Sequence, residues 1–233
     1  MTKNITKAQI PQKDSKVISY PNLVDSESLK ENSGVIRNPG TDFRLDKIAS
    51  IAINRSAVER RCSNYGTRRS IKKDKQAAWL LKAITLMDLT TLSGDDTEAR
   101  VRRLCSKAKQ PISNKLEKIL GAEPLNLSVA AVCVYHDMLA SAKKALNNSK
   151  VNLAAVSTGF PAGLSPLPLR LKEIEYSVDS GANEIDIVIS RRHVLEGNWE
   201  ELYKEVKMFR EKCGDAHMKT ILATRAIRNL SNI

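Results

Sequence analysis

Strand-like and helix-like segments alternate between residues 84 and 224, and this order constrains the fold more than any other feature of the chain. The strand-like runs are Ile84–Thr90, Ala130–Tyr135, Leu153–Thr158, Asn183–Ser190 and Met218–Thr224. Apolar residues at helical spacing occupy the segments between them. Successive βα units predict an α/β protein with a parallel sheet, either doubly wound or closed into a barrel.

Polar side chains at the strand ends favour the barrel over the open sheet. The residues on or near those ends are Asp88, Cys133, Thr158, Asp186 and Lys219. In a (β/α)8 barrel, chemistry comes from residues at the C-terminal ends of several strands. No Gly-x-Gly-x-x-Gly motif follows the first strand-like run, which argues against a dinucleotide-binding sheet.

The run Asn183–Ser190 carries a charge in the middle of a predicted strand. Period-two alternation puts Ile185 and Ile187 on one face and Asp186 on the other. Both faces of a parallel strand are normally covered, so the carboxylate is expected inside the protein. A buried charge needs a partner of opposite sign or a raised pKa. Lys219, inside the next strand-like run, is the candidate partner.

The remaining segments divide the chain into four parts. Residues 1–41 are polar, contain three prolines and lack a sustained period, so we predict a disordered leader. Residues 42–83 are predicted to form a helical, basic extension, which ends in a run of good helix formers. Residues 84–224 hold the predicted barrel domain, and residues 225–233 form a divergent tail in which the βα pattern stops.

The formal net charge of +12 raises the question of nucleic-acid binding. Much of this charge lies in one segment, which contains Arg60, Arg61, Arg68, Arg69, Lys72, Lys73 and Lys75. Few aromatic residues are interleaved with these side chains, and no helix-turn-helix or RNA-recognition signature follows. We therefore favour a solvated basic segment, or one that attracts anionic phosphorylated substrates, over a nucleic-acid site.

Neither a membrane span nor a metal site is predicted. No apolar run is long enough to cross a bilayer, and the N-terminus lacks the apolar core of a secretory signal. The four cysteines are Cys62, Cys105, Cys133 and Cys213, and none of them forms a CxxC pair. The three histidines also lack ligand spacing. These features predict a reducing compartment, the cytoplasm.

Several motifs in the same order resemble the deoxyribose-phosphate aldolases, and the animal forms most closely. The matching runs are Leu86–Leu92 with Asp95–Thr97, Ala130–Tyr135, Thr158–Gly163, Gly181–Ile189 and Lys219–Thr224, together with the helix Gln76–Ala83. The resemblance extends from about residue 42 to residue 224. It implies a TIM-barrel class I aldolase without a cofactor or metal, which cleaves 2-deoxy-D-ribose 5-phosphate to acetaldehyde and D-glyceraldehyde 3-phosphate. A homo-oligomer is compatible with it.

The resemblance also assigns roles to individual residues. Asp186 matches the aspartate of the family's proton relay, and Lys219 matches a further active-site lysine on the fifth strand. Asp88, Thr90 and Cys133 match residues that lie near the substrate. A structural ion pair between Asp186 and Lys219 is the simpler alternative for these two residues.

Two family motifs are missing from the 233 residues. The family's imine-forming lysine belongs to a Phe-Ile-Lys-Thr-Ser-Thr-Gly run on the sixth strand, and its relay lysine to a Gly-Phe-Lys-Pro-Ala-Gly-Gly run on the seventh. The family would follow Ala223-Thr224 with Gly-Glu-Leu, whereas this chain has Arg225-Ala226-Ile227. We therefore expect about the first five of the eight βα units in this chain, and His136 stands where the family usually has proline.

Two other functions stay open from the sequence. The chain could be a catalytically inactive form that acts, if at all, by pairing its exposed sheet edge with another protein. The basic segment around residues 60–75 could bind nucleic acid or another anionic surface. The aldolase interpretation accounts for more of the chain than either of these alternatives.

Overall fold

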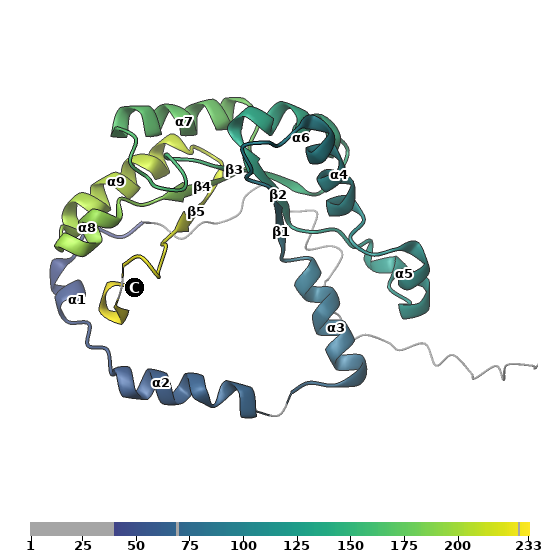
Figure 1. The fold of residues 1–233 in the computed structure, drawn as a ribbon, viewed down its shortest axis with the longest axis horizontal. Helices are drawn as coiled ribbons and strands as arrows, with labels where there is room; N and C mark the ends of the chain where they lie inside the picture. The colour runs from purple at the N-terminus through teal and green to yellow at the C-terminus, as the bar shows by residue number, and fades with distance from the viewer. Residues whose placement is uncertain (1–39, 69, 228) are drawn as a thin grey trace, which may run out of the picture. The chain divides into compact units, whose positions relative to one another are not determined.

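Five parallel strands form one sheet, in the order β1-β2-β3-β4-β5 (Figure 1). This architecture is seen in a computed structural model that describes residues 40–68, 70–227 and 229–233. The strands are β1 (Asp88–Thr90), β2 (Ala131–Tyr135), β3 (Asn152–Val156), β4 (Glu184–Val188) and β5 (His217–Ile221). Spatial order equals sequence order, which is the arrangement of consecutive βα units in a TIM barrel. The predicted parallel sheet is confirmed, and a partial (β/α) barrel is its architecture.

Helices connect the strands and precede the sheet. They are α1 (Leu45–Ala49), α2 (Arg55–Ser63), α3 (Lys73–Ile84), α4 (Glu98–Lys109), α5 (Asn114–Leu120), α6 (Leu139–Leu146), α7 (Leu167–Asp179), α8 (Arg191–Glu196) and α9 (Trp199–Lys212). Short 3-10 turns are η1 (Tyr65–Thr67), η2 (Glu123–Leu125), η3 (His136–Met138) and η4 (Leu230–Asn232).

Local hydrogen bonding and backbone conformation define both ends of helix α5. The Ser113 side chain accepts from the Leu116 amide to begin α5, and left-handed Gly121 ends it.

The contacts divide the chain into residues 1–42 and residues 43–233, and the sheet with its helices belongs to the second unit. The predicted leader, apart from residues 40 and 41, lies outside the described residues, and so does Arg69 of the basic segment. In the predicted tail, Ile227 is 1% exposed and packs with Ile189 and Val194.

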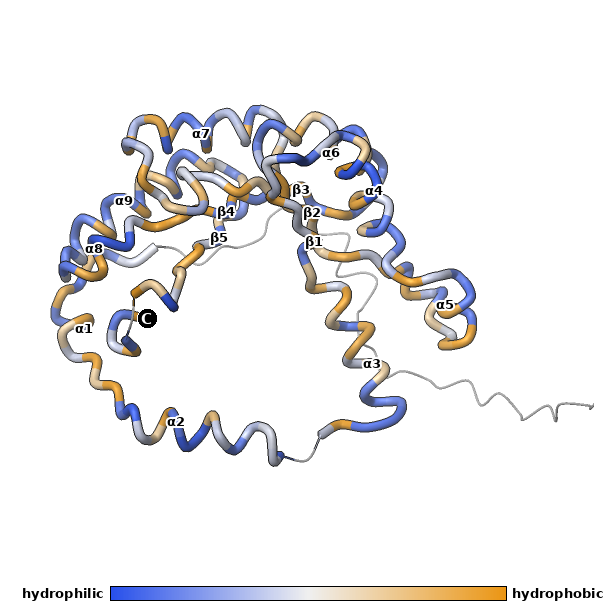
Figure 2. Tube along the Cα trace, in the orientation of Figure 1, coloured by the Kyte–Doolittle hydropathy of each residue, from blue (hydrophilic) through white to orange (hydrophobic). Residues whose placement is uncertain are grey.

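The two faces of the sheet differ in what covers them. One face packs under α4, α6, α7 and α9, and side chains such as Val132, Ile185 and Phe209 meet there in the main core. Hydrophobic and hydrophilic residues alternate along α9 (Figure 2), because only one side of the helix faces this core. The opposite face carries a smaller cluster that includes Cys133 and Val156. The charged strand residues share this second face.

Two predicted elements have different bounds in the structure. The first strand does not begin at Ile84, because α3 continues to that residue and the Thr85 amide and hydroxyl both bond to the Lys82 carbonyl. Strand β1 is therefore only three residues long. After β4, two helices replace the single predicted one, because Gly197 adopts a left-handed conformation (φ 72°) between α8 and α9.

Candidate active site

A single ammonium lies among three carboxylates on the second face of the sheet. The Lys219 Nζ atom is 2.9 Å from Glu184 Oε2 and 3.1 Å from Asp186 Oδ1, and it also donates to the Asp88 carboxylate. The four side chains are between 12% and 31% exposed. We call Asp88, Glu184, Asp186 and Lys219 the charged cluster. Its formal charge is negative, because one cation faces three anions.

Strand register explains how the charged cluster forms. Asp186 and Lys219 are register partners on neighbouring strands β4 and β5. Glu184 precedes Asp186 by two residues, so its side chain lies on the same face. The side-chain amide of Asn152, on β3, donates to Glu184 Oε1 at 2.8 Å. The Glu184 carboxylate is thus held by Asn152 through one oxygen and by Lys219 through the other. Neighbouring strands therefore position the cluster without help from a loop.

The environment shifts the pKa values of two of these groups upward. Burial raises the pKa of the Asp186 carboxyl, and the positive charge of Lys219 only partly opposes this effect. Burial by itself would lower the pKa of Lys219. Hydrogen bonds to Asp88 and Glu184, together with the charge of Asp186, outweigh burial and raise the pKa of Lys219 well above its ordinary value. Lys219 is therefore a permanent ammonium near neutral pH.

Cys133 extends the site along β2. Its thiol Sγ atom lies 3.5 Å from Asp186 Oδ2 and donates to it. Burial, and then the negative charge of Asp186, raise the pKa of the Cys133 thiol to about 12. This cysteine is therefore a neutral donor and not a nucleophile at physiological pH.

The structure brings together four of the five residues chosen from the sequence. Asp88, Cys133, Asp186 and Lys219 form one connected group. The fifth, Thr90, is the register partner of Cys133 and is exposed, and its hydroxyl lies 3.5 Å from the Asp88 carbonyl. Thr90 thus lies beside the cluster and not within it. The ion pair expected between Asp186 and Lys219 is present.

Glu184 is the member of the cluster that sequence reasoning missed. The signal was available, because alternation along β4 places residues 184 and 186 on one face. Glu184 is the first residue of β4, and a charged side chain at the end of a strand is usually exposed to solvent. In the structure it is only 9% exposed.

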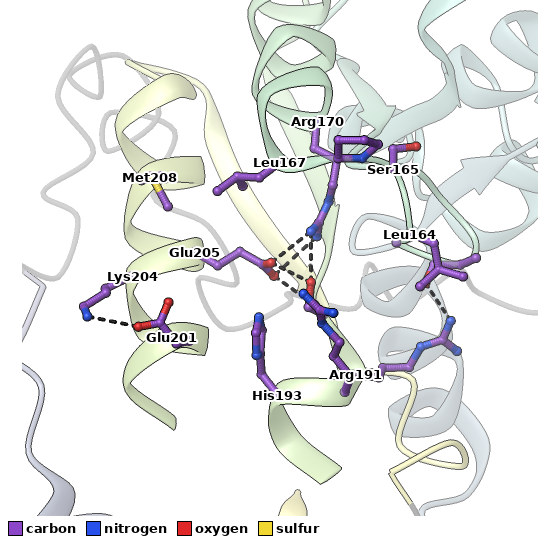
Figure 3. A pocket seen from close by; sticks show the side chains of 15 residues that line it. Leu164, Ser165, Leu167, Arg170, Arg191, His193, Glu201, Lys204, Glu205 and Met208 are labelled. Carbon is purple, nitrogen blue, oxygen red and sulfur yellow. Dashed lines mark hydrogen bonds and ion pairs between the residues drawn. The ribbon is translucent and has the colours of Figure 1, made fainter. Parts of the chain in front are cut away.

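A buried ion pair, separate from the charged cluster, clamps the C-terminal ends of β3 and β4 (Figure 3). The Arg170 guanidinium of α7 pairs with the Glu205 carboxylate of α9 at 2.9 Å, and their side chains are 3% and 7% exposed. Arg170 also donates to the carbonyls of Thr158 and Val188, which follow or end these strands. This clamp holds the strand ends in place through hydrogen bonds to backbone.

Two kinds of feature are absent from the described residues. No group of three or more His, Cys, Asp or Glu side chains in residues 40–68, 70–227 and 229–233 could hold a metal ion. Over the same ranges, no helix has the length and apolar character that crossing a bilayer requires.

Comparison with known proteins identifies the family of this chain. The profile of the DeoC/LacD family aldolases matches residues 82–231, which include every residue of the charged cluster. The chain belongs to the DeoC/LacD aldolase family. Human deoxyribose-phosphate aldolase is 50% identical to it over 198 residues, and the mouse protein is 51% identical over 196 residues. These matches cover 84% and 83% of this chain and 62% of each relative.

Two solved protein structures have a fold similar to that of this chain. Crystal structures of proteins from Coccidioides immitis and Toxoplasma gondii superpose with TM-scores of 0.52 and 0.54. Their sequence identities are 22% and 15%; the matches cover 70% and 67% of this chain and 66% and 55% of those proteins. At these identities the likeness concerns the fold alone. The chain spans about three fifths of the length of its mammalian relatives.

Proposed function

We propose that this chain provides the proton-relay part of a class I aldolase that cleaves 2-deoxy-D-ribose 5-phosphate to acetaldehyde and D-glyceraldehyde 3-phosphate. The observation that carries the proposal is the charged cluster, in which a family-matching aspartate and lysine meet on the inner strand face. Identity of about 50% to mammalian deoxyribose-phosphate aldolases supports the choice of reaction.

Asp186 is the proton-transfer group in this proposal. Aldol cleavage through an imine requires a group that removes a proton from a substrate hydroxyl and later returns one to carbon. A carboxyl whose pKa is raised by burial is better matched to that task than an ordinary aspartate. The Lys219 ammonium beside Asp186 stays positively charged whether the Asp186 carboxyl is protonated or ionised.

Lys219 acts by its charge and not as the nucleophile. An amine attacks a carbonyl only when it is deprotonated, and imine-forming lysines have a lowered pKa. The three carboxylates around Lys219 shift its pKa in the opposite direction. The imine-forming lysine of the family motif is absent from the 233 residues, so we propose that the complete reaction needs that lysine in addition.

Asp88, Thr90 and Cys133 form the proposed substrate wall. Asp88 belongs to the charged cluster, Cys133 contacts Asp186 of that cluster, and Thr90 presents a hydroxyl beside them. The substrate class is a small phosphorylated sugar, and a homo-oligomer stays a prediction. Because all four cysteines are free thiols, we place the activity in a reducing compartment, the cytoplasm.

A chimeric barrel tests the proposed reaction. Residues 43–224 of this chain would be joined to the segment of the human relative that carries the family's sixth-strand and seventh-strand lysine motifs. Acetaldehyde release from 2-deoxyribose 5-phosphate supports the proposal. A folded chimera without activity contradicts it, provided that the human parent is active in the same assay.

Borohydride trapping tests the role of Lys219. The 233-residue chain is incubated with 2-deoxyribose 5-phosphate, reduced with sodium borohydride and analysed by intact mass. We expect no adduct at Lys219, whereas the human enzyme should be labelled under the same conditions. A reduced adduct that peptide mapping assigns to Lys219 would show that this residue can act as the nucleophile.

A further inference from the structure

A cavity of about 420 Å³ lies outside the charged cluster, between the loop before α7 and helices α8 and α9 (Figure 3). Its size is within the range of sites that hold small organic ligands. The Arg170–Glu205 clamp forms part of its wall. Basic side chains predominate among the ionisable groups that line it: Arg170, Arg191, Arg192, His193 and Lys204, against Glu201 and Glu205.

Both acidic side chains in this cavity already have partners. The Glu205 carboxylate accepts from Arg170, from the Ser190 amide at 2.8 Å and from the Ser190 hydroxyl at 2.6 Å. Lys204 lies 3.0 Å from Glu201 and pairs with it. Lys204 also pairs with Glu200, which does not line the cavity. Each carboxylate that lines the cavity therefore has a cationic partner.

The remaining basic groups have free donors. Arg191 Nη2 donates to the Ala162 carbonyl at 2.9 Å and to the Pro161 carbonyl at 3.5 Å, and its guanidinium has no carboxylate partner within the described chain. Arg192 is exposed and makes no ion pair or hydrogen bond with a described residue. His193 Nδ1 is buried and has no hydrogen-bond partner among the residues that the structure describes. A buried polar atom without a partner is uncommon, and a bound ligand would satisfy it.

Apolar side chains complete the cavity wall. Leu164, Leu167 and Met208 line it together with the basic groups, and Leu164 is 82% exposed. A bare inorganic ion would leave this apolar surface in contact with water. A ligand with an anionic head and a short carbon body would contact both parts of the wall.

We propose that this cavity is a second binding site, separate from the charged cluster, for a small phosphate monoester. Arg191 and Arg192 bind the phosphate by charge-assisted hydrogen bonds, and His193 donates or accepts one more. The carbon body lies against Leu164, Leu167 and Met208. The site does not depend on the aldolase reaction, because none of its residues belongs to the charged cluster.

Calorimetric titration of the 233-residue chain with glycerol 3-phosphate, at constant ionic strength, tests the proposal. We expect saturable binding that is about tenfold weaker in Arg192→Gln and weaker again when His193→Gln is added. Arg61→Gln is the matched control, because it removes the same charge from an exposed site on α2. It should bind within twofold of the wild type, and so should Asp186→Asn.

Three results would overturn the proposal. No saturable binding would remove the site altogether. Equal weakening in Arg192→Gln and Arg61→Gln would show diffuse attraction to a basic protein and not a defined cavity. Inorganic phosphate that binds as tightly as glycerol 3-phosphate would contradict the role given to the apolar wall.

Discussion

Lys219 on β5 donates a hydrogen bond to Asp88 on β1, so one contact joins the first and last strands of the sheet. Four strand spacings of about 4.8 Å would separate these strands by roughly 19 Å in a flat sheet. A lysine and an aspartate side chain cannot bridge that distance. The sheet therefore curves so that its second face is concave, and β1 and β5 lie across from each other as in a barrel. The charged cluster is a product of this curvature.

Asp186→Asn should separate activity from stability. In the chimeric barrel, we expect acetaldehyde release to fall by about 10²-fold or more, because the amide cannot accept the proton. A carboxyl whose folded pKa is raised is stabilising in its protonated form, and that benefit is lost as pH rises through the folded pKa. The neutral amide should therefore leave the melting temperature at pH 7 unchanged or higher. An active variant would refute the proton-transfer role.

Cys133 should resist alkylation although it adjoins the site. With a thiol pKa of about 12, it has very little thiolate at pH 8, whereas Cys62 is exposed. Peptide mapping after iodoacetamide treatment should show Cys62 labelled far ahead of Cys133. Asp186→Asn removes the nearby negative charge, so it should lower the thiol pKa and increase Cys133 labelling at pH 9 to 10. The exposed control Asp95→Asn should not change the labelling rate.

Glu184→Gln should weaken the electrostatic interactions that stabilise the Lys219 ammonium. Removing one of three carboxylates lowers the pKa of Lys219, which can be followed by NMR titration of the lysine side chain. Because the folded pKa lies above the unfolded value, the ammonium stabilises the fold fully below the unfolded value of about 10.4 and loses that effect as pH rises through the folded value. At pH 7 we expect a loss of about 1 kcal/mol in urea unfolding.

The matched control for this variant is Glu200→Gln on the surface of α9. Glu200 pairs with Lys204, and both side chains are more than half exposed. Exposed ion pairs contribute little to stability, so unfolding of this control should not change measurably. Equal effects of the two variants would mean that burial gives the charged cluster no special strength.

Glu205→Gln should be among the most destabilising single changes in the chain. It leaves the Arg170 guanidinium, 3% exposed in its side chain, without a counter-charge, at a cost of about 3–5 kcal/mol. Urea unfolding of Glu205→Gln, Arg170→Met and the double variant forms a double-mutant cycle. The double variant should lose clearly less than the sum of the single losses. Additive losses would show that the pair does not act as a unit.

Much of the fold could be predicted from the sequence because its signals are local. The alternating strand and helix patterns identify the βα units, and the lone charge in Asn183–Ser190 predicts that Asp186 pairs with Lys219 on the adjacent strand. The start of β1 was less predictable. The residues before it form helix readily, and apolar pattern alone does not separate a buried helix end from a short strand.

Local pattern determined which residues face inward, since period-two alternation fixes the face of each strand residue. Only the tertiary structure decided which inward residues meet. Asp88 and Lys219 are 131 residues apart, and the curvature of the whole sheet brings them into contact. Glu184 entered the cluster in the same way, through Asn152 on one neighbouring strand and Lys219 on the other. Sequence spacing carries no information about curvature, because curvature results from the packing of all the strands and helices together.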